Sequence, residues 1–145
     1  MATLDALLTA ARAKLATVSG SIVSEETIHT IRSPGRSPRH KEFAIGRMRT
    51  VPLRDRQKPA DGMPSHHSLQ LIAAFQLSPK SRQVSNDAAI QYEAQLRAKM
   101  LAMDWLSAAD VACNIVYTGT DESAGDDGWI WFVMGFEALQ TVTIS

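Results

Sequence analysis

The strongest hydrophobic pattern lies at the end of the chain, where residues 128–145 read GWIWFVMGFEALQTVTIS. Aromatic and β-branched residues of this kind are typical of strands. Because side chains alternate between the two faces of a strand, this one has two apolar faces. One face carries Trp129, Trp131 and Val133, and the other carries Ile130, Phe132, Met134 and Phe136. Such a strand must be covered on both sides, so we expect it at the centre of a sheet, with residues 139–144 left for a neighbouring chain.

Two segments have the three- and four-residue spacing of amphipathic helices. The first, residues 3–17, begins at the potential N-cap Thr3 and has Asp5 in its first turn. The second, residues 86–103, is predicted to be capped by Ser85 or Asn86. Its apolar stripe consists of Tyr92, Leu96, Met100 and Met103, widened by Ile90, Ala94 and Leu101.

Alternating or β-rich patterns predict further strands at 27–31, 43–51, 67–77 and 111–117. A polar, glycine-containing loop at 118–128 then joins the last of these to the terminal strand. The predicted fold is α+β: a small mixed or antiparallel sheet packed by two main helices, in the order α-β-β-β-α-β-β. At 145 residues the chain has room for one domain, residues 1–145, with one core.

Residues 32–65 form a segment that we call the basic arm. It holds five of the six prolines, and nine basic residues lie between Arg32 and Lys58 against two acids, Glu42 and Asp55. We expect a long basic hairpin or insertion, because a long irregular loop is usually functional or disordered. Either it is a solvated charged loop, or its side chains contact a neighbouring ring or DNA. The candidates are Arg36, Arg39, Lys41, Arg47, Arg49, Arg54 and Arg56.

Negative charge gathers in the 118–128 loop, at Asp121, Glu122, Asp126 and Asp127. The loop lacks the EF-hand ligand spacing that calcium sites of this kind use. A solvated hairpin tip is the simplest interpretation, and an electrostatic contact with a basic surface is the alternative. Opposite charges on one small subunit favour head-to-tail contacts, which close into rings when the rotation allows.

Overall composition narrows the classes of partner. Fifteen basic and fifteen acidic residues give a net charge of zero, so no net field favours nucleic acid or a membrane. The single cysteine, Cys113, excludes an intrachain disulfide and is expected in the core. Neither a signal peptide nor a run long enough to span a membrane is recognisable, which predicts a soluble protein in the cytoplasm.

Reactive chemistry is not expected. The chain contains no nucleophile elbow, phosphate-binding loop, dinucleotide fingerprint or HExxH motif. His66 and His67 are adjacent, so in a strand they point to opposite faces and do not easily share an ion, and His29 and His40 have no fixed spacing to them. We therefore predict that the protein is not an enzyme and has no cofactor and no metal site.

Four segments carry a resemblance to a known family. They are HSLQLIAAFQL at 67–77, SNDAAIQYEAQLRAKMLAM at 85–103, VACNIVYTG at 111–119 and GWIWFVMGFEALQTVTIS at 128–145. In the order of its predicted elements, in its size and in its pattern of hydrophobic and polar residues, the chain resembles the tail terminator, or tail-completion, proteins of long-tailed bacteriophages. The basic arm departs from the shorter connections expected of that family.

The resemblance implies a hexameric ring of identical subunits at the head-proximal end of the tail tube. Such a ring binds the last ring of tail-tube protein, stops its polymerisation and presents its other face to the head–tail connector or stopper protein. DNA passes through the lumen, where contact is non-specific. The protein would then be a virion component of the tail and neck, assembled in the host cytoplasm, with no membrane partner. The alternatives are another neck protein, such as a head-closure protein or adaptor, and a nucleic-acid-binding module that uses the basic arm.

The subunit interface is expected to include Phe136, Leu139 and Val142. These residues belong to the closing strand, whose apolar area exceeds what one small sheet can cover.

Overall fold

A computed structural model describes residues 4–52, 65–102 and 113–140 of the chain. Within these ranges the sequence folds into two helices and a five-stranded mixed sheet, in the order α-β-β-β-α-β-β, which confirms the predicted fold class. A short 3-10 turn, η2 (Asp126–Gly128), separates the last two strands. The main elements are α1 (Leu4–Leu15), β1 (Ile22–Val23), β2 (Glu42–Pro52), β3 (Ser65–Gln76), α2 (Arg82–Leu101), β4 (Cys113–Ala124) and β5 (Trp129–Gln140).

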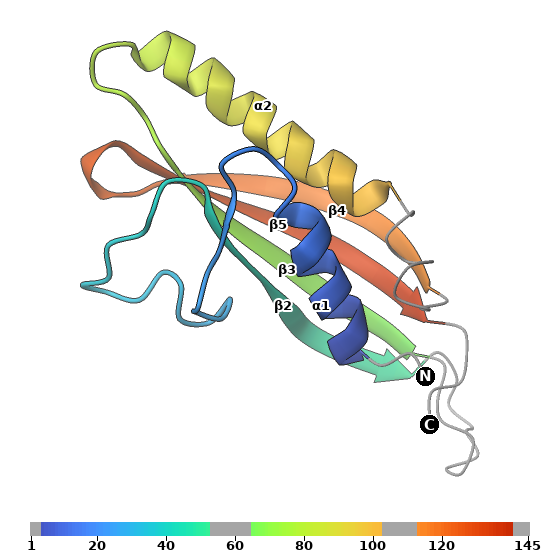
Figure 1. Cartoon of the computed structure of the whole chain (residues 1–145). Coiled ribbons are helices and arrows are strands. Elements are labelled where there is room, and N and C mark those ends of the chain that lie inside the picture. The colour runs from blue at the N-terminus through green and yellow to red at the C-terminus, as the bar shows by residue number, and fades with distance from the viewer. Residues whose placement is uncertain (1–3, 53–64, 103–112, 141–145) are drawn as a thin grey trace.

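The strands lie in the spatial order β1-β2-β3-β5-β4 (Figure 1). β2 pairs with β3, β3 with β5 and β5 with β4, all antiparallel, whereas the short β1 is parallel to β2. The terminal strand β5 therefore has a strand on each side, as predicted from its two apolar faces. Within the described residues, the outermost strands of the sheet are β4 on one side and the two-residue β1 on the other, and β2 forms the edge beyond the end of β1.

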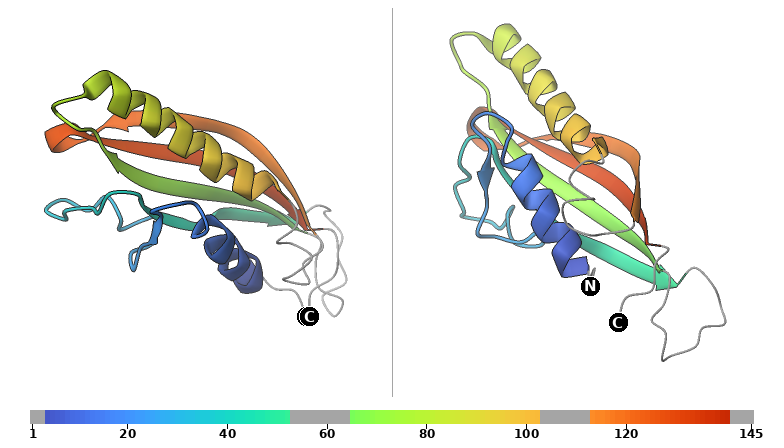
Figure 2. Two further views of the ribbon diagram at one scale, coloured as in Figure 1. Left: turned by 45° about the horizontal axis from the view of Figure 1, so that its top comes forward. Right: turned by 45° about the vertical axis from the view of Figure 1, so that its right-hand side comes forward.

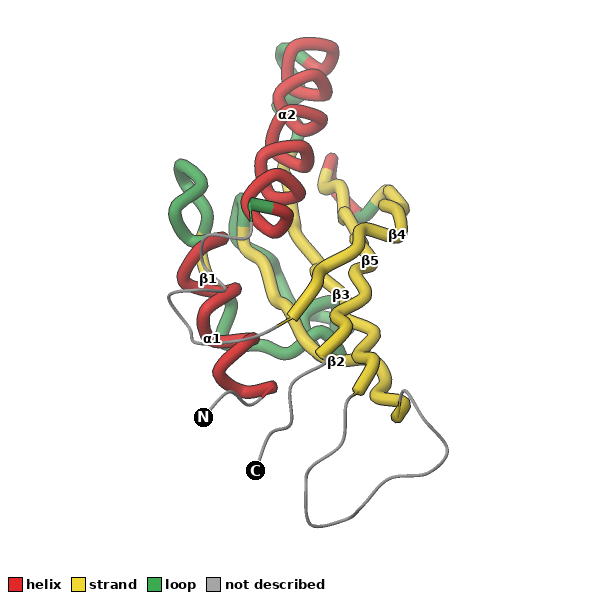
Figure 3. The backbone as a smooth tube through the Cα atoms, turned by 90° about the vertical axis from the view of Figure 1, so that its right-hand side faces the viewer, coloured by secondary structure: helices red, strands yellow, loops and turns green. Residues whose placement is uncertain are grey.

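Both helices pack on the same face of the sheet (Figure 3). α1 lies beside β2 and α2 beside β4, so each helix covers one half of that face (Figure 2). The helix-covered face buries alternate side chains of β3 and β5, from Leu69 to Phe75 and from Ile130 to Ala138. Three residues of the predicted α2 stripe, Tyr92, Leu96 and Met100, are buried against them, and the fourth, Met103, lies outside the described residues.

The opposite face of the sheet is covered in part by the segment between β1 and β2. Ile28 and Ile31 of this segment pack on Ala44 and Ile72, with Trp131 and Val133 partly buried alongside. The sequence pattern predicted a strand at 27–31, and that prediction is wrong. The backbone N–H of Ile31 donates to the carbonyl of Thr27, 2.9 Å away, so the segment makes a turn. The three-residue spacing of the two isoleucines places both on the sheet from this turn.

α2 begins at Arg82, one turn before the predicted start at residue 86. The predicted caps, Ser85 and Asn86, therefore lie inside the helix, and Ser81 occupies the N-cap position. The Ser85 hydroxyl accepts a hydrogen bond from the backbone N–H of Ser78, 2.8 Å away. Ile90 and Leu101, which were expected to widen the apolar stripe, are exposed. Glu93 is buried on that side instead, and its carboxylate accepts a hydrogen bond from the Thr120 hydroxyl of β4 at 2.8 Å.

Candidate assembly interface

The first part of the basic arm folds back on the protein around one buried carboxylate. Glu42 is fully buried and accepts hydrogen bonds from the Ser24 hydroxyl at 2.5 Å and from the backbone N–H of Arg39 at 3.0 Å. The guanidinium of Arg36 forms an ion pair with the same carboxylate and lies 3.5 Å from Glu26. A guanidinium nitrogen of Arg39 lies 3.6 Å from Glu42. Two arginines expected to face DNA or a neighbouring ring thus have partners within the subunit.

The hydrogen bonds at Glu42 outweigh the effect of its burial. Burial alone would raise the pKa of this carboxyl group, because it disfavours the charged form. The hydrogen bonds from Arg36, Ser24 and the Arg39 backbone, with the charge of Arg36, lower the pKa from 4.5 to about 2. Glu42 was not among the residues predicted to organise the basic arm. The available signal was that it is one of only two acids within a run of nine basic residues.

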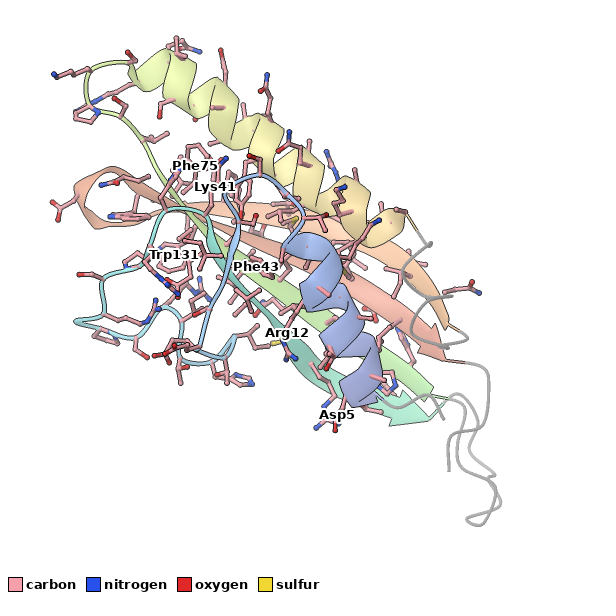
Figure 4. All side chains as sticks on the ribbon, in the orientation of Figure 1. Asp5, Arg12, Lys41, Phe43, Phe75 and Trp131 are labelled. Carbon is pink, nitrogen blue, oxygen red and sulfur yellow. The ribbon has the colours of Figure 1, made fainter. Side chains whose placement is uncertain are left out.

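Lys41 is also occupied within the subunit. Its ammonium group donates to the carbonyl of Ser19 at 3.1 Å and lies 5.3 Å from the ring centroid of Tyr92. The Tyr92 hydroxyl donates to the Lys41 carbonyl at 3.2 Å, and the Lys41 backbone N–H donates to Ala74 at 2.8 Å. Figure 4 shows Lys41 beside Phe75 at the start of β2. Lys41 therefore joins the basic arm to the core instead of pointing into solvent.

Two arginines of the basic arm, Arg47 and Arg49, are exposed on β2. They flank an irregularity in the pairing with β3, where Arg47 lies opposite Leu69 and Arg49 opposite Ser68. Arg54 and Arg56 lie outside the described residues. Within the described residues, the positive charge that β2 offers to a partner therefore lies at one edge of the sheet.

Among the residues that the structure describes, the outer edge of β2 is paired only at its beginning. Within the described ranges, β1 pairs with Glu42 and Phe43 and ends there, with the Ser24 backbone N–H donating to the Phe43 carbonyl at 2.8 Å. Along a strand, alternate residues direct their backbone groups to the same edge. Since Phe43 faces β1, the next residues to face outward are Ile45 and Arg47.

A groove of about 630 Å³ runs along this open edge. One wall belongs to α1, where Asp5 and Arg12 lie on the side of the helix next to β2 (Figure 4). The opposite wall is the 23–29 segment, and residues 44–47 of β2 line the groove between them. Leu4 and Leu8 make the α1 wall partly apolar. The groove thus lies where β1 would continue if it were longer.

Two of the predicted acidic residues, Asp121 and Glu122, lie at the other edge of the sheet, whereas Asp127 lines a hollow together with residues 32–38 of the basic arm. The predicted polar loop at 118–128 is wrong in its extent, because β4 continues to Ala124 and only a tight turn follows. Asp121 and Glu122 are exposed on β4, whose only strand partner among the described residues is β5. Asp127 is exposed in the turn with a left-handed backbone (φ 56°), and the Asp126 side chain lies outside the described set.

The residues predicted for the subunit interface are distributed differently. Phe136 is 1% exposed and packs against the ring of Tyr117 with centroids 5.6 Å apart, so it is a core residue that offers no surface to a neighbour. The backbone of Leu139 is paired within β5, opposite His66 and Asn114. The Leu139 side chain and Val142 lie outside what the structure describes.

The histidines occupy separate environments. His67 is buried and its Nδ1 lies 2.8 Å from the Thr50 hydroxyl, whereas the half-buried His66 is paired with Glu137 on the opposite face. His40 Nδ1 accepts a hydrogen bond from the Gln76 backbone N–H at 3.1 Å, and burial together with the nearby Lys41 charge lowers the pKa of His40. Across residues 4–52, 65–102 and 113–140, no group of three or more His, Cys, Asp or Glu side chains is placed to hold a metal ion.

No protein-family model matches this chain, and no curated protein matches it. In the described part of the chain, neither helix combines the length and apolar character needed to cross a membrane.

Proposed function

We propose that this chain is a structural virion protein of the tail terminator class. Its copies form a ring that caps the tail tube, stops polymerisation of the tube protein and joins the tube to the head–tail connector. Assembly takes place in the host cytoplasm, and the finished ring belongs to the tail and neck of the virion. Within the described residues, β4 and the part of β2 beyond β1 are unpaired sheet edges of opposite charge, and this is the observation that supports the proposal.

An open sheet edge presents backbone donors and acceptors that readily pair with another strand. One such edge, on β2, carries the exposed Arg47 and Arg49, and the other, on β4, carries the exposed Asp121 and Glu122. Like edges of two copies repel, whereas unlike edges attract. Contacts between unlike edges are head-to-tail, and head-to-tail contacts build rings or filaments instead of closed dimers. Ring formation is the property that a tail terminator requires.

The internal pairing of the basic arm favours this function over a nucleic-acid-binding module. Affinity for DNA rises with the number of phosphates that lysine and arginine neutralise. Arg36, Arg39 and Lys41 are engaged with Glu42, Ser19 and Tyr92, which reduces the charge available for such contacts. In the proposed ring, contact with DNA in the lumen is correspondingly weak and non-specific.

The function is tested by adding the purified protein to tail-tube protein of the same phage while the tube protein polymerises. We expect shorter tubes as the proportion of terminator rises, with a ring of extra density at one tube end in electron micrographs. A charge-reversal variant at an exposed position away from both edges, Lys80→Glu, serves as the control and should cap as well as the wild type. Tubes of unchanged length and bare ends would exclude the terminator function. Binding to the connector alone would assign the chain to another class of neck protein.

A further inference from the structure

Resting on the proposed ring, we propose how neighbouring subunits join. The open edge of β2 in one copy pairs with the open edge of β4 in the next, antiparallel, with Arg47 opposite Glu122. The sheets of successive copies then form one continuous sheet around the ring. The partner is therefore a second copy of this chain, and the surface that receives it is the groove beside β2.

Strand directions within the subunit set the direction of this pairing. Three antiparallel pairings separate β2 from β4, namely β2 with β3, β3 with β5 and β5 with β4. Three reversals make β2 and β4 run in opposite directions. A rotation about an axis along the strands leaves all directions unchanged, so a neighbour related by that rotation presents an antiparallel β4 to β2. The rotation also keeps the helix-covered faces on the same side of the joined sheet.

The groove supplies the space for the incoming strand. β1 leaves the edge after Val23, and the residues of β2 that follow, Ile45 and Arg47, direct their backbone groups outward. The 630 Å³ groove lies along residues 44–47, between α1 and the 23–29 segment. A strand placed there is covered on one side by Leu4 and Leu8 and on the other by the turn that follows β1.

Charge and length together fix the register. With Arg47 opposite Glu122, antiparallel pairing places Ile45 opposite Ala124, the last residue of β4. The tight turn of the neighbour then begins where β1 ends, so the two strands share the edge of β2 without overlapping. Within the subunit, Arg47 pairs with Leu69 and Glu122 with Phe132, both of which point to the helix-covered face. The two charges therefore lie on the same face of the joined sheet.

A second pair of opposite charges, Arg49 and Asp121, also lies on one face of the joined sheet. Arg49 lies opposite Ser68 and Asp121 lies opposite Val133, both on the face away from the helices. Each edge also has a large apolar side chain that is exposed, Met48 on β2 (54% exposed) and Val116 on β4 (49% exposed). Pairing of two β2 edges would instead bring arginines together, which is unfavourable.

Charge reversal in two separate proteins tests the pairing. Arg47→Glu and Glu122→Arg each place like charges at every interface, and each should weaken association at each interface about tenfold, measured by sedimentation velocity. Mixing the two variants in equal amounts places unlike charges at every interface of a ring that alternates them, so the ring should re-form. The double variant should also assemble alone, and Lys80→Glu should behave as the wild type. Circular dichroism verifies that each exposed substitution leaves the fold intact.

Cross-linking gives an independent readout on the assembled ring. In a Cys113→Ser background, Arg47→Cys combined with Glu122→Cys should yield a ladder of covalent oligomers with a short thiol cross-linker, and neither single cysteine should. Covalent dimers from Arg47→Cys alone would overturn the pairing in favour of two β2 edges. A third outcome would also overturn the β2–β4 pairing. If deletion of residues 141–145 abolishes the ring and neither charge reversal weakens it, the C-terminal segment of the neighbour occupies the groove instead of β4.

Failure of this pairing is distinguishable from failure of the proposed function. A wild-type ring that caps tubes but ignores both charge reversals refutes the β2–β4 contact and leaves the terminator function standing. A wild-type protein that neither assembles nor caps tubes refutes both.

Discussion

Replacing Glu42 with glutamine tests whether the buried carboxylate organises the first part of the basic arm. The carboxylate is fully buried, forms an ion pair with Arg36 and accepts hydrogen bonds from the Ser24 hydroxyl and the Arg39 backbone N–H. Its pKa falls from 4.5 to about 2 on folding, and each pKa unit corresponds to about 1.4 kcal/mol of differential interaction. The ionised group therefore contributes roughly 3 kcal/mol to the free energy of unfolding at neutral pH.

The dependence on pH follows from the direction of this shift. Since the folded pKa is the lower one, the contribution is complete above the unfolded value of 4.5 and is lost as pH falls towards 2. At pH 3 it should have fallen to roughly 1 kcal/mol. Glu42→Gln should thus destabilise the protein by about 3 kcal/mol at pH 7 and by much less at pH 3.

Urea unfolding followed by circular dichroism at pH 7, 5 and 3 measures these differences. Glu25→Gln is the matched control, because Glu25 is exposed and should be neutral within about 0.5 kcal/mol at each pH. A Glu42→Gln variant as stable as the wild type at pH 7 would refute the assignment. A loss of stability that is equal at pH 7 and pH 3 would also refute it, since the loss would then come from packing and not from the charge.

Three further substitutions test the core and its polar contacts. Phe136→Ala should lower the free energy of unfolding by about 3–5 kcal/mol in urea titrations, and a loss below about 1 kcal/mol would show that this side chain is not in the core. Thr120→Val removes the hydrogen bond to the buried Glu93 and should lower the free energy of unfolding by about 1–3 kcal/mol. The control Thr118→Val, at an exposed position, should change the free energy of unfolding little, and equal effects of the two substitutions would contradict the role of Thr120. Burial raises the pKa of Tyr92 to about 12, so stability should fall as pH rises from about 10 to 12, and Tyr92→Phe should remove part of that fall; an unchanged profile would contradict the shift.

The sequence predicted the parts of the fold that depend on local periodicity. The alternation of residues 129–138 identified β5 as a central strand, and the spacing of Tyr92, Leu96 and Met100 identified the buried side of α2. Both signals arise because burial of one face repeats at the period of the element. Periodicity does not tell whether an apolar side chain packs within the subunit or against a neighbour, so Phe136 was expected in the subunit interface and is found in the core.

The candidate interface was harder to predict because it depends on pairing between distant residues. The sequence around Asp121 and Glu122 predicted a loop, since an exposed edge strand shows little hydrophobic alternation. The charge of Arg36 and Arg39 looked available, because their partner Glu42 is buried only through the tertiary fold. The segregation of charge was visible in the sequence, and the placement of Arg47 and Glu122 on opposite sheet edges required the strand order.

Native mass spectrometry of the wild-type protein over a range of concentrations shows whether copies of this chain join head to tail into a closed ring. We predict one dominant closed species, a hexamer, whose mass is a whole multiple of the 15.8 kDa subunit and does not grow further with concentration. A subunit that stays at 15.8 kDa at every concentration, or a series of oligomers that lengthens without limit, would contradict it.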